Sequence, residues 1–144
     1  DVTLTLDTAI YASGDVLADT QTITSAYRVN GGKAVLESLV VIDQDDQGTA
    51  LDVWFLGTSV VFGTENAIPL ITDANALRVL GRIVVAAADF ADLGGVRVAT
   101  LRSLGMVLQN GDDSKNLYVA AVTQAGTPTN TAAGITLRLG LILH

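Results

Sequence analysis

The stretch from Lys33 to Leu56 constrains the fold of this chain more than any other. Its sequence, KAVLESLVVIDQDDQGTALDVWFL, contains two runs rich in aliphatic and β-branched residues, Val35–Ile42 and Leu51–Leu56. Between them, Asp43–Gly48 supplies polar turn residues and a glycine that can adopt a positive φ. The pattern predicts two β-strands joined as a hairpin. Because both runs are apolar on two faces, we expect the strands to lie inside a sheet or against a neighbouring subunit.

Short segments of the same kind recur along the chain, each bounded by Gly, Asn or Asp. The clearest is Ile135–Leu143, in which five aliphatic side chains alternate with Thr136, Arg138 and Gly140. A helix of two turns is predicted over Asp73–Leu80, capped by Thr72 or Asp73 and ended by Gly81, and Ala87–Leu93 is ambiguous, with room for one helical turn. Gln109–Asn116 is predicted to be a polar hairpin loop. The remaining predicted strands are Val2–Asp7, Gln21–Val29, Ser59–Phe62, Arg82–Ala86, Val96–Leu101, Leu104–Leu108 and Leu117–Thr123. Helix is the alternative for Gln21–Val29, and Val16–Ala18 is a short apolar piece.

Eight to ten short strands with one or two short helices predict an all-β fold, an antiparallel β-sandwich. The first and last strands are both strongly patterned, which is typical of a jelly-roll-like arrangement whose ends lie inside the sheets. No fixed-period repeat is visible, which argues against a solenoid or propeller. At 144 residues the chain is predicted to form a single domain spanning residues 1–144.

Composition indicates which partners to expect. Hydrophobic residues make up 49% of the chain, more than a lone domain requires, so we expect a homo-oligomer that buries the surplus between subunits. The formal net charge is −7 and no basic stripe is present, so we expect neither nucleic acid nor an anionic membrane as a partner. Cysteine is absent, so neither a disulfide framework nor a thiolate metal site can form. The start of the chain shows no signal-peptide pattern.

No residue pattern predicts a catalytic, cofactor-binding or metal-binding site, and we do not expect an enzyme. His144 is the only histidine and has no second ligand or orienting partner near it in the sequence. The acidic loops Asp43–Asp46 and Asn110–Asp113 could supply oxygen ligands to a cation, although solvated turns are the simpler interpretation. Trp54 is predicted to be a core residue or an interface anchor. The alternative for this residue is a sugar-stacking platform shared with Tyr11, Tyr27 and Tyr118.

Four segments resemble small virion proteins of tailed bacteriophages. They are SGDVLADT (Ser13–Thr20), the stretch Arg28–Leu56, GTENAIPLITDANALRVLG (Gly63–Gly81) and LYVAAVTQAGTPT (Leu117–Thr129). The similarity runs through nearly the whole chain, and the most similar role is that of a head decoration, or cement, protein.

The resemblance implies a structural protein that assembles, commonly as a homotrimer, on the outer surface of the capsid after folding in the host cytoplasm. Such proteins bind across neighbouring major capsid subunits and stabilise the shell, without cofactors or catalytic residues. A carbohydrate- or receptor-binding β-sandwich module of a phage tail or fibre remains the alternative. An exposed aromatic shelf surrounded by polar residues would mark that alternative.

Overall fold

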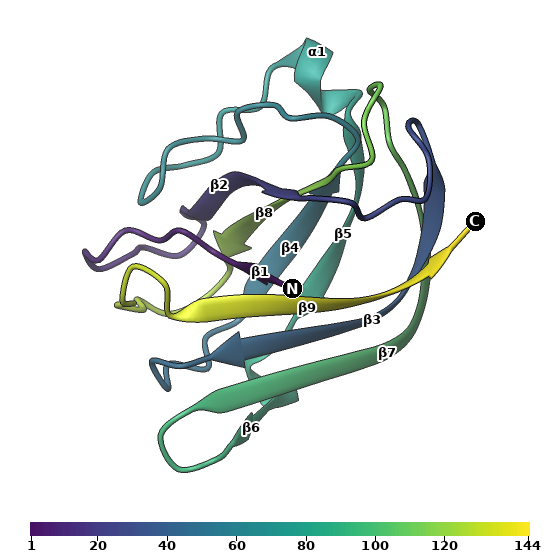
Figure 1. Cartoon of the computed structure of the whole chain (residues 1–144). Coiled ribbons are helices and arrows are strands. Elements are labelled where there is room, and N and C mark those ends of the chain that lie inside the picture. The colour runs from purple at the N-terminus through teal and green to yellow at the C-terminus, as the bar shows by residue number, and fades with distance from the viewer.

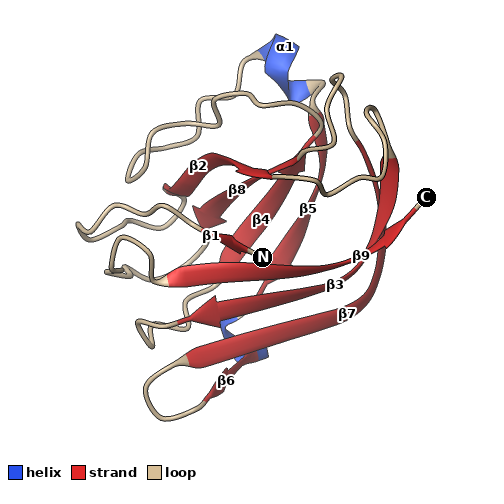
Figure 2. Cartoon of the chain, in the orientation of Figure 1, coloured by secondary structure: helices blue, strands red, loops and turns tan.

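Two antiparallel β-sheets lie face to face in the computed structural model, which describes all residues from Asp1 to His144 (Figures 1 and 2). The predicted all-β sandwich is therefore confirmed. The five-stranded sheet has the order β1 (Val2–Thr3), β9 (Ile135–Leu143), β3 (Lys33–Asp43), β7 (Arg97–Gln109) and β6 (Phe90–Asp92). The four-stranded sheet has the order β2 (Val16–Ile23), β8 (Leu117–Thr123), β4 (Leu51–Leu56) and β5 (Val79–Val85). The helix α1 (Asp73–Ala76) and the 3-10 turn η1 (Ala87–Asp89) are the two short helices.

The strands pair in a nested order along the chain. β4 pairs with β5, β3 with β7, β2 with β8, and β1 with β9, as if one long hairpin had been rolled up. The pairs β3–β9 and β4–β8 then join the rolled ribbon into two sheets. This wrapping of a paired ribbon gives the jelly roll, so the jelly-roll-like prediction is also confirmed.

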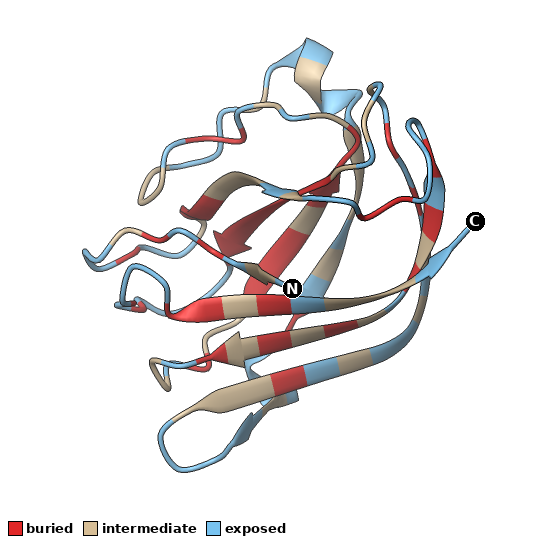
Figure 3. Cartoon of the chain, viewed as in Figure 1, coloured by how far each residue is buried: buried red, intermediate tan, exposed pale blue.

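The main core lies between the two sheets and contains 22 buried residues. Alternate side chains of each strand point into it, as the period of two requires, and Figure 3 shows the resulting alternation along β3 and β9. Leu4 and Leu6 also belong to this core, although β1 ends at Thr3. Their backbone N–H groups donate to Ile135 O and Ala132 O, so the chain continues beside β9 as an extended segment.

A second, smaller apolar cluster covers the opposite face of the four-stranded sheet. The connection between β4 and β5, residues 57–78, passes over this outer face and contributes Phe62 to the cluster. The sheet is therefore buried on both sides, which explains why every residue of β8 is buried. The other buried members are Val16, Leu56, Tyr118, Ala120 and Val122.

Both predicted hairpins are wrong. β3 and β4 belong to different sheets, and so do β7 and β8, so residues 44–50 and 110–116 form connections that cross between the sheets. The expectation that Val35–Ile42 and Leu51–Leu56 lie inside sheets is nevertheless confirmed. β3 lies between β9 and β7, and β4 lies between β8 and β5.

Several other elements differ from their predicted bounds. β2 ends at Ile23, because Ser25 adopts a left-handed conformation with φ of 56° and turns the chain away from the predicted strand Gln21–Val29. Ser59–Phe62 forms no strand, since this segment packs over the outer cluster instead of pairing in a sheet. The predicted helix Asp73–Leu80 ends at Ala76, and β5 begins at Val79.

The two predicted strands Val96–Leu101 and Leu104–Leu108 form one continuous strand, and Arg102 and Ser103 lie inside it. In this strand, β7, Ser103 and Gly105 adopt φ values of 56° and 62°. The register of β3 against both β7 and β9 shifts between Leu36 and Ser38, so the irregularity crosses the sheet at one level. Bulges of this kind bend a sheet, and the long strands curve in Figure 1.

Candidate functional site

A pocket of about 410 Å³ lies on the outer face of the four-stranded sheet, beneath the β4–β5 connection. Trp54, in the middle of β4, points to this face because its neighbours Val53 and Phe55 point into the main core. Trp54 is paired with Arg82 of β5 and Ala120 of β8. The residues that line the pocket are Gly14, Asp52, Trp54, Phe62, Pro69, Ile71, Val79, Arg82, Val122 and Gln124.

Asp52 is the buried polar group of this pocket. It precedes Trp54 by two residues, so both side chains share the outer face of β4, and the Asp52 side chain is only 1% exposed. Its Oδ2 accepts hydrogen bonds from Arg82 Nη1 at 2.6 Å and from Gln124 Nε2 at 2.8 Å. Its Oδ1 is buried and has no hydrogen-bond partner. This oxygen is therefore a buried polar atom whose hydrogen-bonding capacity is left unsatisfied.

Trp54 is held between other side chains. The Arg82 guanidinium lies over its ring, 5.6 Å from the ring centroid, and the Phe62 ring centroid lies 5.7 Å away at an interplanar angle of 41°. Its Nε1 is buried without a hydrogen-bond partner. Trp54 therefore packs partly buried against the outer cluster, and its proposed role as an interface anchor stays a prediction.

The predicted sugar-stacking platform does not form. Tyr11 and Tyr27 lie in the main core, and Tyr118 lies in the outer cluster. Burial raises the pKa of both Tyr11 and Tyr27 to about 12, because the anionic phenolate would lose its hydration inside the core. These tyrosines are structural residues, so the platform alternative is wrong for them.

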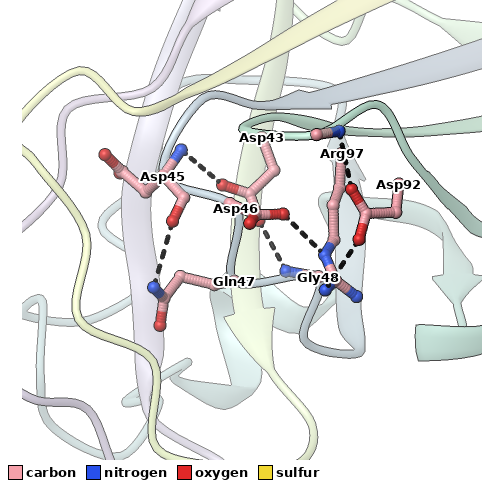
Figure 4. A network of polar contacts seen from close by, with 8 residues as sticks. Asp43, Asp45, Asp46, Gln47, Gly48, Asp92 and Arg97 are labelled. Atoms are coloured by element: carbon pink, nitrogen blue, oxygen red, sulfur yellow. Dashed lines mark hydrogen bonds and ion pairs between the residues drawn. The ribbon is translucent and has the colours of Figure 1, made fainter.

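The acidic turn after β3 uses its carboxylates to hold loops together (Figure 4). Asp43 is buried, and its two oxygens accept hydrogen bonds from the backbone N–H groups of Asp45 at 2.9 Å and Gly48 at 2.7 Å. Asp46 accepts a hydrogen bond from Arg97 Nε at 2.8 Å, which raises the pKa of Arg97. Asp45 accepts a hydrogen bond from the backbone N–H of Thr131 at 2.8 Å. The turn therefore joins β3 to the start of β7 and to the loop before β9.

The second acidic loop is closed around Asn110. Its Nδ2 donates to Ser114 Oγ and to Asn116 O, and its Oδ1 accepts from the backbone N–H of Asp112. Hydrogen bonds from Ser114 and from the Tyr118 hydroxyl lower the pKa of Asp112. The structure brings no three acidic or histidine side chains together as a metal-binding group. His144 lies exposed at the end of β9.

Exposed aliphatic side chains are concentrated on the β4–β5 connection and on β5. The chain has eleven large apolar side chains that are exposed, and five of them lie between residues 61 and 84. Leu77 is the most exposed, at 86%, because α1 ends before its side chain can pack. The other four are Val61, Ile68 and Leu70 on the β4–β5 connection and Val84 on β5, each more than half exposed.

Comparison with protein families, curated proteins and solved structures found no match to this chain. The resemblance to phage virion proteins therefore stays a prediction. Neither of the two short helices has the length and apolar character needed to cross a membrane.

Proposed function

We propose that this chain is a structural virion protein that decorates and stabilises the capsid of a tailed bacteriophage by binding across neighbouring major capsid subunits. The observation that carries the proposal is the concentration of five exposed aliphatic side chains on the β4–β5 connection and β5. Clustered exposed apolar residues are typical of protein–protein contact sites. The resemblance of four sequence segments to virion proteins supports the same class.

β5 adds a backbone component to this surface. It is the edge strand of its sheet and spans seven residues, of which only Arg82 is charged. The Arg82 guanidinium is bonded to Asp52, so it does not protect the edge in the way that an outward-pointing charge would. A long apolar edge of this kind is suited to pairing with another chain.

The mechanism is contact alone. Covering one exposed Leu, Ile or Val side chain contributes roughly 1.5–3 kcal/mol, so a few such contacts per copy are sufficient for binding. Copies on a symmetric shell bind together through multivalency. A protein that binds assembled shell and not free subunits stabilises the assembled state by mass action. We expect the chain to act as a homo-oligomer, with a trimer as the expected state.

The experiment mixes the purified chain with mature capsid shells of the phage that encodes it and with its unassembled major capsid subunits. We expect the chain to co-sediment with shells and not with free subunits, and to raise the temperature at which the shells disrupt. Light scattering of the free chain reports its oligomeric state.

A pair of variants links binding to the proposed surface. Leu70→Lys combined with Leu77→Lys should remove binding, because both side chains lie on the β4–β5 connection. Val107→Lys is the matched control, since Val107 is similarly exposed but lies on β7 in the other sheet. Equal binding by both variants, or no binding by the unaltered chain, would contradict the proposal.

The alternative role, a carbohydrate- or receptor-binding module of a tail or fibre, was expected to display an aromatic shelf. The burial of Tyr11 and Tyr27 in the main core favours the capsid role over a module of that kind.

A further inference from the structure

We infer that β5 pairs edge to edge with β5 of a second copy of this chain, antiparallel and across a twofold axis. The inference does not rest on capsid binding, because it concerns the isolated chain. β5 is the outermost strand of its sheet, and its seven residues span about 23 Å. One side of the strand pairs with β4, so the backbone N–H and C=O groups on its other side have no partner strand.

Most of the other sheet edges are too short, already covered or bent. β1 and β6 contain two and three residues. The register of β2 shifts twice, and its outer edge is occupied at Val16, which exchanges backbone hydrogen bonds with Asn66 and Ala67. β7 extends beyond β6, but positive φ values at Ser103 and Gly105 bend that part of its edge. Only β5 and the end of β9 that β1 leaves uncovered remain open.

Charge at the two ends of β5 selects a second copy as the partner and an antiparallel orientation. Arg78 immediately precedes the strand, is exposed and forms no ion pair. Asp89 follows the strand, and its Oδ2 accepts from the backbone N–H of Ala86 at 2.8 Å, so this charge is held at the end of β5. An antiparallel pair centred on Ile83 brings Arg78 of each copy to the end of the other β5, where Asp89 lies. A parallel pair would instead bring like charges together.

The same register suits the side chains along the strand. It opposes Arg82 to Val84 of the other copy, so the two Arg82 side chains do not face each other. Val84 is 51% exposed and then packs against the aliphatic part of the Arg82 side chain. Ile83 lies at the partly buried margin of the main core and meets the second Ile83. The apolar core is thereby extended across the contact.

The uncovered end of β9 lacks this complementarity. It comprises the five residues Leu139–Leu143, so it is shorter than β5. Arg138, the charged residue at its start, is already paired with Asp1 at 3.1 Å. A pair of β9 strands would therefore form no ion pair equivalent to that between Arg78 and Asp89, and this edge provides the control.

Analytical ultracentrifugation of the isolated chain measures the contact. We expect an even number of copies, which is a dimer, or a hexamer where the threefold contact of a trimer also forms. Val84→Lys places a charge on the open edge, and we expect it to weaken association by at least about tenfold. Ile142→Lys is the matched control, because Ile142 is 52% exposed and lies on the uncovered end of β9. We expect the control to associate as the unaltered chain does.

A charge exchange tests the orientation of the two strands. Arg78→Glu and Asp89→Arg each bring like charges together, and we expect each alone to weaken association by about tenfold. The double variant restores the ion pair with its signs reversed, and we expect its association constant to lie within about threefold of that of the unaltered chain. Purely structural effects of the two substitutions would add in the double variant instead of cancelling.

Four results would overturn the inference: the free chain is a monomer or a trimer, Val84→Lys associates as the unaltered chain does, Ile142→Lys weakens association as strongly as Val84→Lys, or the charge exchange restores nothing. Circular dichroism confirms that each variant is folded. A dimer that does not bind shells would contradict the capsid role alone. A trimer that binds shells would contradict the β5 pair alone, so the two proposals fail separately.

Discussion

Tyr11→Phe should destabilise this protein, and Tyr27→Phe should not. Both side chains lie in the main core and are 1% and 2% exposed. The Tyr11 hydroxyl accepts from the backbone N–H of Asp7 at 2.6 Å and donates to Leu17 O at 3.1 Å. The Tyr27 hydroxyl is buried and has no partner. The same atom is therefore removed from two equally buried rings in different hydrogen-bonding states.

The expected magnitudes follow from this difference. Tyr11→Phe deprives a backbone N–H and a carbonyl of their partner, which should lower the free energy of unfolding by about 1–3 kcal/mol. Tyr27→Phe removes a buried hydroxyl that makes no compensating bond, which should leave the free energy of unfolding unchanged or raise it by up to about 1 kcal/mol. The two variants should therefore differ by at least about 1 kcal/mol.

Urea denaturation followed by circular dichroism measures both values. The denaturant slopes should match that of the unaltered protein, so that the midpoints report stability directly. Trp54 fluorescence provides a second probe of the same transition. If Tyr27→Phe is destabilised as strongly as Tyr11→Phe, the Tyr27 hydroxyl has a partner in solution, and the assignment of an unsatisfied group at this position is refuted.

Three further predictions concern the core, the acidic turn and the pocket. In the folded protein the pKa of Tyr11 and of Tyr27 is about 12, above the ordinary value of 10.0. The stability that their neutral forms contribute is therefore complete below pH 10, and it is lost as the pH rises towards 12. Between these pH values each tyrosine should lower the free energy of unfolding by about 1.4 kcal/mol per pH unit. Tyr27→Phe should therefore halve the slope of the free energy of unfolding against pH, and an unchanged slope would contradict the raised pKa of Tyr27. Asp43→Ala should lower the free energy of unfolding by about 2 kcal/mol, because Asp43 accepts two backbone hydrogen bonds. Asp113 is exposed, so Asp113→Ala should lower it by less than about 0.5 kcal/mol in the same urea titration. Equal losses for the two variants would show that the turn does not depend on Asp43. Trp54→Ala should lower the free energy of unfolding by about 2–3 kcal/mol, less than for a fully buried tryptophan. Trp54→Phe should retain most of the stability, because it keeps the contact with Phe62. A loss below about 1 kcal/mol for Trp54→Ala would show that the outer cluster does not depend on Trp54.

The strands could be predicted from the sequence because their signal is local. Ile135–Leu143 alternates with a period of two, and the observed β9 has the same bounds. Leu117–Thr123 and Leu51–Leu56 were also predicted with their observed bounds. The partner of each strand was not predictable, because the residues of Asp43–Gly48 suit a hairpin as well as a crossing between sheets. Pairing of β3 with β7 and β9 is decided by contacts distant in sequence.

The outer cluster accounts for the other errors. Val60 and Phe62 are apolar because they cover the second face of a sheet, so their pattern imitated a strand. Leu77 belongs to the predicted helix Asp73–Leu80, but the helix ends at Ala76 and the Leu77 side chain is exposed. Helices this short depend on packing for their stability.

The pocket was only partly accessible to prediction. Trp54 is predicted from the sequence to be a core residue or an interface anchor, whereas no role is predicted for Asp52, Arg82 or Gln124. Asp52 did carry a signal, since it is a lone acidic residue in an otherwise apolar strand, two positions from Trp54. Arg82 and Gln124 come from other parts of the chain, and their approach to Asp52 depends on the register of β5 and on the end of β8.

The nested pairing order has a consequence for biosynthesis. Leu137, in β9, pairs with both Val2 and Val41, so β1 has no neighbour, and β3 has only β7, until the ribosome has made β9. At ordinary translation speeds, the aliphatic side of β3 waits on the order of ten seconds for that neighbour. During this interval the aliphatic surface of the nascent chain is exposed to other proteins. Chaperones that cover this surface until release should determine the yield of native protein.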